Sequence, residues 1–152
     1  MNAKPLGPAA HGVLDYAFAG MHAMAPTLFN LRGRARTVCY CFAASHAGIA
    51  ALTDYPAGVR RTIPFDVHGK MDLGYLPALL AVPAMVGALR QRNALRYFAT
   101  MFAVGSATWL LTDFSRGSKR RTTTQKLLPR TVEYSAPQDA GADENVEAIF
   151  AS

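Results

Sequence analysis

The sequence predicts an all-α protein, a bundle of four transmembrane helices built from two parallel helical-hairpin repeats. The first observation is a duplication: the phrase His-Gly-x-x-Asp begins at His11 and again at His68, 57 residues later. A second phrase, Leu-Thr-Asp followed by an aromatic residue, begins at Leu52 and again at Leu111. Two phrases that recur at nearly constant spacing indicate two copies of one supersecondary unit.

The second observation is the distribution of charge. Four stretches contain no Asp, Glu, Lys or Arg: residues 16–31, 37–53, 73–89 and 97–112. A membrane-spanning helix needs roughly 20 predominantly apolar residues, with a minimum near 17. The helices of a bundle surrounded by water would each show a charged stripe at 3.6-residue spacing, and none of these stretches has one. With 51% hydrophobic and 17% charged residues overall, the chain favours four membrane spans.

The elements follow in order along the chain. After an N-terminal lead at 1–9, the first hairpin repeat covers 10–55 (helices at 10–30 and 36–55), a linker covers 56–66, and the second repeat covers 67–114 (helices at 67–90 and 93–114). Pro56 ends the second helix, and Pro64 keeps the linker extended until the third begins. Short connections within each repeat predict antiparallel hairpins.

The last segment, residues 115–152, is basic and then acidic, which is typical of a disordered or surface-lying tail. We expect its basic part to contact anionic lipid head groups. It has no interleaved aromatic residues, which argues against nucleic acid as a partner. Ten Lys and Arg residues on the side of the termini, against six in the hairpin loops, predict a bacterial inner-membrane protein with both termini cytoplasmic. The partners expected are the bilayer and a second membrane protein or a second copy of this chain.

Parallel repeats predict where the ionisable residues lie. Since each repeat holds two helices, both copies enter in the same direction, and the starts of the first and third helices share one end with the ends of the second and fourth. Residues at i and i+4 share a helix face, so the His and Asp of each repeated phrase point the same way. Six ionisable side chains therefore gather at one level: His11, Asp15, Asp54, His68, Asp72 and Asp113.

This cluster predicts a site that binds a divalent cation or shares protons. Four carboxylates cannot all stay ionised together without a bound cation, shared protons or pairing with histidine, because like charges and burial raise their pKa values. Two imidazoles with carboxylates suit a divalent metal such as Zn, Fe or Mn better than copper(I). The alternative is an accessory or scaffold subunit of a membrane complex, in which the same residues only lock the hairpins together. Both interpretations stay open, and the sequence carries no nucleophile or cofactor fingerprint that would define an enzymatic reaction.

Two further histidines, His22 and His46, fall in the middle of adjacent helices at similar depth. Paired histidines of this kind can ligate haem axially. Each is more often a hydrogen-bonded core residue, and neither position is repeated in the second half. Haem is therefore the less favoured alternative.

The pattern His-Gly-x-Leu-Asp from His11, the Ala25-Pro26 pair and the phrase ending in Tyr55, with their recurrences, resembles small bacterial membrane proteins of the SPW-repeat type. The resemblance covers residues 11–114 and implies paired membrane spans with a proline near the end of the first helix of each repeat. It implies an architecture and no activity. This chain has Ala-Pro-Thr at 25–27 and Val-Pro-Ala at 82–84 where the name of that family describes Ser-Pro-Trp.

Overall fold

The structure is a computed structural model, and it describes residues 4–115. Its elements are α1 (Pro8–Leu28), α2 (Arg34–Leu52), α3 (Phe65–Met85), a short 3₁₀ helix η1 (Ala88–Arg90) and α4 (Arg92–Leu111). The prediction of an all-α protein with four helices is confirmed for this part of the chain.

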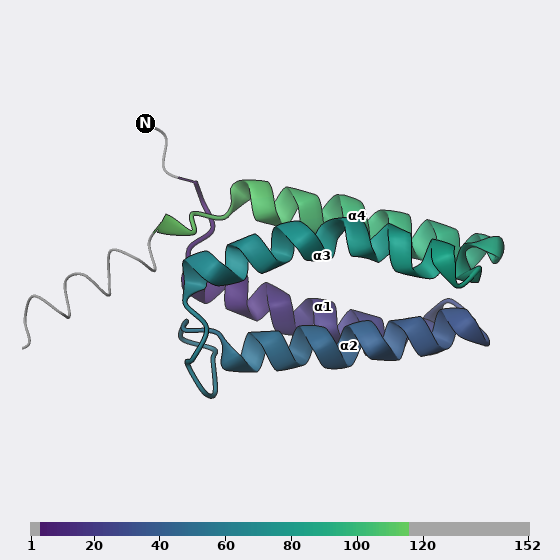
Figure 1. Ribbon diagram of the computed structural model, residues 1–152, viewed down its shortest axis with the longest axis horizontal. Helices are drawn as coiled ribbons and strands as arrows, with labels where there is room; N and C mark the ends of the chain where they lie inside the picture. The colour runs from purple at the N-terminus through teal and green to yellow at the C-terminus, as the bar shows by residue number, and fades with distance from the viewer. Residues whose placement is uncertain (1–3, 116–152) are drawn as a thin grey trace, which may run out of the picture.

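The four helices form two antiparallel hairpins that lie against each other (Figure 1). α1 runs alongside α2, and α3 runs alongside α4. The starts of α1 and α3 and the ends of α2 and α4 lie at one end of the bundle, and the hairpin turns lie at the other. This arrangement brings the two copies of each repeated phrase to the same end.

The prediction of membrane spans is wrong. Within residues 4–115, no helix combines the length and the hydropathy that a membrane crossing requires. The assignment as a multi-pass protein of the bacterial inner membrane, with both termini cytoplasmic, is overturned with it. The uncharged stretches of 16 or 17 residues fell short of a full span, and their many Ala, Gly, Ser and Thr residues make them only weakly apolar. The expected lipid contact of the tail concerns residues outside the described part of the chain, and a protein partner or second copy stays a prediction.

The observed helix bounds lie within about three residues of the predicted ones, except at the end of α3. This helix stops at Met85 because Gly87 adopts a left-handed conformation with φ of 70°. Glycine adopts this conformation without the steric cost that other residues meet. The chain then makes η1 before α4 begins.

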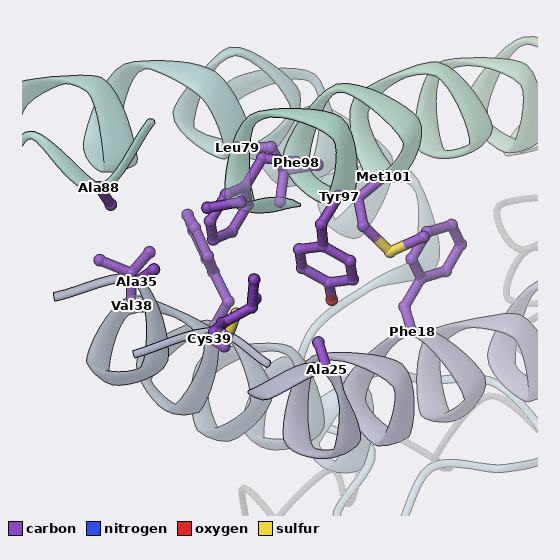
Figure 2. Packing of buried hydrophobic residues seen from close by; sticks show 13 residues of the cluster. Phe18, Ala25, Ala35, Val38, Cys39, Leu79, Ala88, Tyr97, Phe98 and Met101 are labelled. Atoms are coloured by element: carbon purple, nitrogen blue, oxygen red, sulfur yellow. The ribbon is translucent and has the colours of Figure 1, made fainter. Parts of the chain in front are cut away.

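Two apolar clusters fill the bundle. The larger one, drawn in Figure 2, takes side chains from all four helices, among them Phe18, Cys39, Leu79 and Phe98. A smaller cluster of Ala50, Tyr55 and Phe65, with Ala57 and Phe114 against it, closes the end where the repeated phrases meet. His11, Asp15 and His68 are buried at this end of the bundle, in contact with Tyr55, Phe65 and Phe114 of the smaller cluster.

The same backbone connection occurs twice at this end. Leu6, which precedes α1, donates to Leu111 O (3.1 Å) and accepts from the N–H of Asp113 (2.8 Å). Ile63, which precedes α3, donates to Leu52 O (2.9 Å) and accepts from the N–H of Asp54 (2.7 Å). The start of each hairpin is thus tied to the end of the other, and these ties hold the first turns of α1 and α3 next to each other.

Candidate metal centre

The centre is built from the first turns of two equivalent helices. α1 contributes His11 and Asp15, and α3 contributes His68 and Asp72, each pair at the i, i+4 spacing that places both side chains on one face. Three of the four are almost fully buried, with exposed fractions of 2% for His11, 3% for Asp15 and 0% for His68. The structure thus brings together four of the six residues predicted for the cluster.

A glycine next to each histidine lets an aromatic ring lie directly on the helix. A Cβ atom on Gly12 would lie 2.6 Å from the ring of Tyr55, and one on Gly69 would lie 2.5 Å from the ring of Phe114. Any side chain at these positions would push the ring away. The rings of Phe65 and Phe114 also pack against His11, with centroid distances of 5.5 and 5.2 Å. These aromatic side chains cover the outer side of the centre.

Each imidazole is oriented by a threonine of the other repeat. His11 Nδ1 lies 2.9 Å from Thr112 Oγ1, and His68 Nδ1 lies 2.8 Å from Thr53 Oγ1. Both hydroxyls already donate their single proton to a backbone carbonyl one turn earlier, at 2.7 Å. Each hydroxyl therefore accepts from an Nδ1–H group, which turns Nε2 of both imidazoles toward the centre.

The inward-facing atoms lie at nearly equal distances. The two Nε2 atoms of His11 and His68 are 3.2 Å apart. Asp15 places Oδ1 at 3.3 Å from His11 Nε2 and Oδ2 at 3.3 Å from His68 Nε2. Asp72 Oδ2 lies 3.2 Å from His11 Nε2 and 3.3 Å from His68 Nε2. These are the distances of hydrogen-bonded or co-ligating groups, and they join α1 to α3.

The charges in the centre stabilise one another. Burial alone would lower the pKa of His68, but hydrogen bonds and charges from Asp15 and Asp72 outweigh it and raise this pKa to about 9. Burial alone would raise the pKa of Asp15, but hydrogen bonds to His46 and His68 and the charge of His11 hold it far below its ordinary value. The pKa of Asp72 is lowered in the same way, by His11 and His68. Without a metal, the centre near neutral pH holds two carboxylates and a protonated His68 between them.

The structure does not bring Asp54 and Asp113 to this group. Within the described residues, the side chains whose ligand atoms lie close enough to hold one ion are His11, Asp15 and His68. Asp113 Oδ1 accepts from the N–H and the hydroxyl of Ser115, at 3.1 and 2.6 Å. The physical reason lies in the preceding residues: Thr53 and Thr112 are extended (ψ of 142° and 132°), and successive side chains of an extended chain point to opposite sides. Since each threonine points inward, the aspartate after it points away.

The residues His22 and His46 do not fit a haem group. Their ring centroids are 6.2 Å apart, but aromatic rings occupy the space around them: Phe18 stacks on His46 at 5.7 Å, and Phe42 packs on His22 at 5.5 Å. His22 Nδ1 is hydrogen-bonded to the hydroxyl of Tyr97 at 2.7 Å. Burial, together with the nearby His46, lowers the pKa of His22 to about 4, which keeps this imidazole neutral. His22 is therefore a hydrogen-bonded core residue, which is the interpretation that the sequence favoured over haem ligation.

Two residues of the centre were not predicted from sequence. His46 Nε2 lies 3.6 Å from Asp15 Oδ1, so this imidazole borders the centre from α2. Tyr55 donates its hydroxyl to Asp15 Oδ2 at 2.9 Å. The aromatic residue that ends each repeated phrase was a signal for Tyr55. His46 was predicted only as a candidate haem ligand, and no counterpart in the second repeat linked it to this centre.

Comparison with protein-family models, with curated proteins and with solved structures finds no match to this chain. The resemblance to the SPW-repeat type therefore stays a prediction. Fold and geometry together define a four-helix protein with a buried His/Asp group that could hold a metal ion.

Proposed function

We propose that this protein binds one divalent metal ion, with Zn²⁺ as the first candidate, through His11 Nε2, His68 Nε2 and the carboxylate of Asp15. The observation that carries the proposal is the spacing of the inward-facing atoms: the two Nε2 atoms lie 3.2 Å apart, and one oxygen of Asp15 lies 3.3 Å from each of them, Oδ1 from His11 and Oδ2 from His68. In tetrahedral coordination with bonds of about 2.0–2.1 Å, two ligand atoms lie about 3.3–3.4 Å apart. The observed spacings are close to this value, with Asp15 presenting a different oxygen to each imidazole.

The orientation of the imidazoles supports the proposal. Metal-ligating histidines characteristically donate their other ring N–H to a fixed acceptor, which sets the tautomer and the ring direction. Thr112 and Thr53 are such acceptors for His11 and His68. With both protons on Nδ1, two Nε2 lone pairs would face each other at 3.2 Å, an arrangement that requires a positive charge between them. The proton that Asp15 and Asp72 favour on His68 would supply this charge in the metal-free protein, and a metal ion would replace that proton.

The donor set also limits which metal fits. Two imidazoles and one carboxylate are ligands of catalytic zinc sites and of non-haem Fe(II) sites, and Mn²⁺ accepts the same donors less strongly. The carboxylate of Asp72 borders this three-ligand set, because its Oδ2 lies 3.2–3.3 Å from both Nε2 atoms. The internal duplication supports the set, since each repeat supplies one of its two imidazoles in the same way.

The test is metal content and affinity in a matched pair of variants. His11→Gln removes a proposed ligand, while His22→Gln removes an equally buried imidazole outside the centre. Wild type and His22→Gln should each bind one Zn²⁺ per chain in isothermal titration calorimetry of metal-free protein, and His11→Gln should lose this binding. Elemental analysis of freshly purified protein would identify Zn, Fe or Mn as the resident ion. The proposal fails if wild type binds no divalent ion, or if both variants bind it as wild type does.

A further inference from the structure

A small cavity lies directly beside the proposed metal centre. Its volume is about 30 Å³. One wall consists of side chains of the centre and its border: His11, Asp15, His46 and Asp72. The rest of the lining is largely apolar and includes Phe18, Leu76, Leu79 and Trp109. The cavity therefore joins the polar centre to the apolar interior of the bundle.

The apolar wall is held in place. Leu79 is only 2% exposed and belongs to the larger apolar cluster. Trp109 donates its indole N–H to Gly69 O at 2.8 Å, which ties this ring to the first turns of α3. Gly105 also lines the cavity, and a Cβ atom there would lie 2.9 Å from Leu76 Cδ2. The width of the cavity thus depends on glycine at position 105, because any side chain there would crowd Leu76.

The size of the cavity limits what it can hold. One water molecule requires about 10–15 Å³ of such volume, so the space fits about two waters, or one molecule of two or three non-hydrogen atoms. An aromatic or heterocyclic ligand would require displacement of Leu76 or Leu79. Metal sites that act on a ligand keep one coordination position open, whereas purely structural sites are closed by four protein ligands.

We propose that the metal ion keeps an open coordination position toward this cavity, and that the cavity restricts the incoming ligand to a small inorganic molecule or anion of two or three non-hydrogen atoms. The inference rests on the metal binding proposed above. The incoming ligand would bind in the space next to His11, Asp15 and Asp72. Leu76 and Gly105 would limit the size of that ligand.

The first test uses Co²⁺-loaded protein, because the visible absorption of Co²⁺ reports changes in its coordination. Azide, a linear anion of three atoms, should change the spectrum, whereas imidazole, a five-membered ring, should not do so at equal concentration. In Leu76→Ala, the enlarged cavity should let imidazole bind. Leu80→Ala is the matched control, since this half-buried residue of α3 packs on the larger cluster and is absent from the cavity wall.

A second pair of variants changes the cavity in the opposite direction. Gly105→Ala should weaken azide binding about tenfold, because the added methyl group overpacks the space beside Leu76. Gly74→Ala adds a methyl group to α3 where no atom lies within 4 Å, and azide binding should be unchanged.

The outcomes separate this inference from the proposed function. Stoichiometric Co²⁺ binding without any response to azide would overturn the open position while leaving the metal site intact. Equal binding of azide and imidazole to wild type, or equal effects of Leu76→Ala and Leu80→Ala, would overturn the size limit. A wild-type protein that binds no Co²⁺ would overturn the metal site itself, and the inference with it.

Discussion

The two halves of the centre share one backbone plan but hold their carboxylates differently. In the first repeat the hydroxyl of Tyr55 donates to Asp15, and His46 borders the same carboxylate. In the second repeat the equivalent ring is Phe114, which has no hydroxyl, and the side chain of Asp72 is 18% exposed against 4% for Asp15. The difference teaches that the carboxylate of Asp15 is held by more partners and is less exposed than that of Asp72.

The largest difference should appear when each carboxylate is neutralised. Asp15→Asn leaves a buried, protonated His68 with one carboxylate fewer, and the loss of one partner of a buried ion pair costs about 3–5 kcal/mol. Asp72→Asn should cost about 1 kcal/mol, because water reaches this carboxylate and weakens its interactions. Urea unfolding of the metal-free proteins measures both values, with Asp54→Asn as the control outside the centre. Equal losses in the first two variants would contradict the assigned roles.

The second prediction concerns pH. His68 has a raised pKa of about 9 in the folded protein against an ordinary value of 6.5, so its contribution is complete below pH 6.5 and is lost as the pH rises through 9. The loss in the metal-free protein should amount to about 3 kcal/mol at most. The lowered pKa values of Asp15 and Asp72 add stability above about pH 4 that disappears as the pH falls. Unfolding free energies at pH 6 and pH 9.5 should show the decline, and Asp15→Asn should flatten it more than Asp72→Asn does.

The third prediction exchanges the aromatic residues that distinguish the halves. Tyr55→Phe removes a hydrogen bond to a charged acceptor and should cost about 1.5–3 kcal/mol. Phe114→Tyr places a hydroxyl at the equivalent position over α3 and should stabilise the protein by about 1 kcal/mol if it reaches Asp72. Thermal unfolding of the two single variants and of the double variant measures these effects. A destabilising Phe114→Tyr would show that the two halves differ in more than this hydroxyl.

The smallest effects should come from changes at the two equivalent threonines, and these effects should be equal in the two repeats. Thr53→Val and Thr112→Val keep the side-chain shape but remove the acceptors of His68 and His11. Each should cost about 1 kcal/mol of stability and about tenfold in Zn²⁺ affinity. Calorimetric titration of the two variants side by side is the measurement. Clearly unequal affinities would place the asymmetry of the centre in the imidazoles as well as in the carboxylates.

Much of this arrangement could be predicted from the duplicated phrases. Helix number, the shared end of the helices and the meeting of His11, Asp15, His68 and Asp72 follow from counting residues and from helical spacing. The membrane prediction failed because an absence of charge was taken for strong hydropathy, although Ala, Gly, Ser and Thr fill much of the uncharged stretches. Asp54 was misplaced because the helix was predicted to continue to Tyr55, while the chain is already extended at Thr53.

The exchange of ties between the hairpins also decides whether one repeat can form this end of the bundle by itself. Each histidine is oriented by a threonine of the other repeat, and each hairpin start pairs with the opposite hairpin end. One repeat by itself therefore lacks half of every connection, whereas two identical copies would supply all of them. A single repeat expressed alone would therefore complete these connections only by pairing with a second copy of itself.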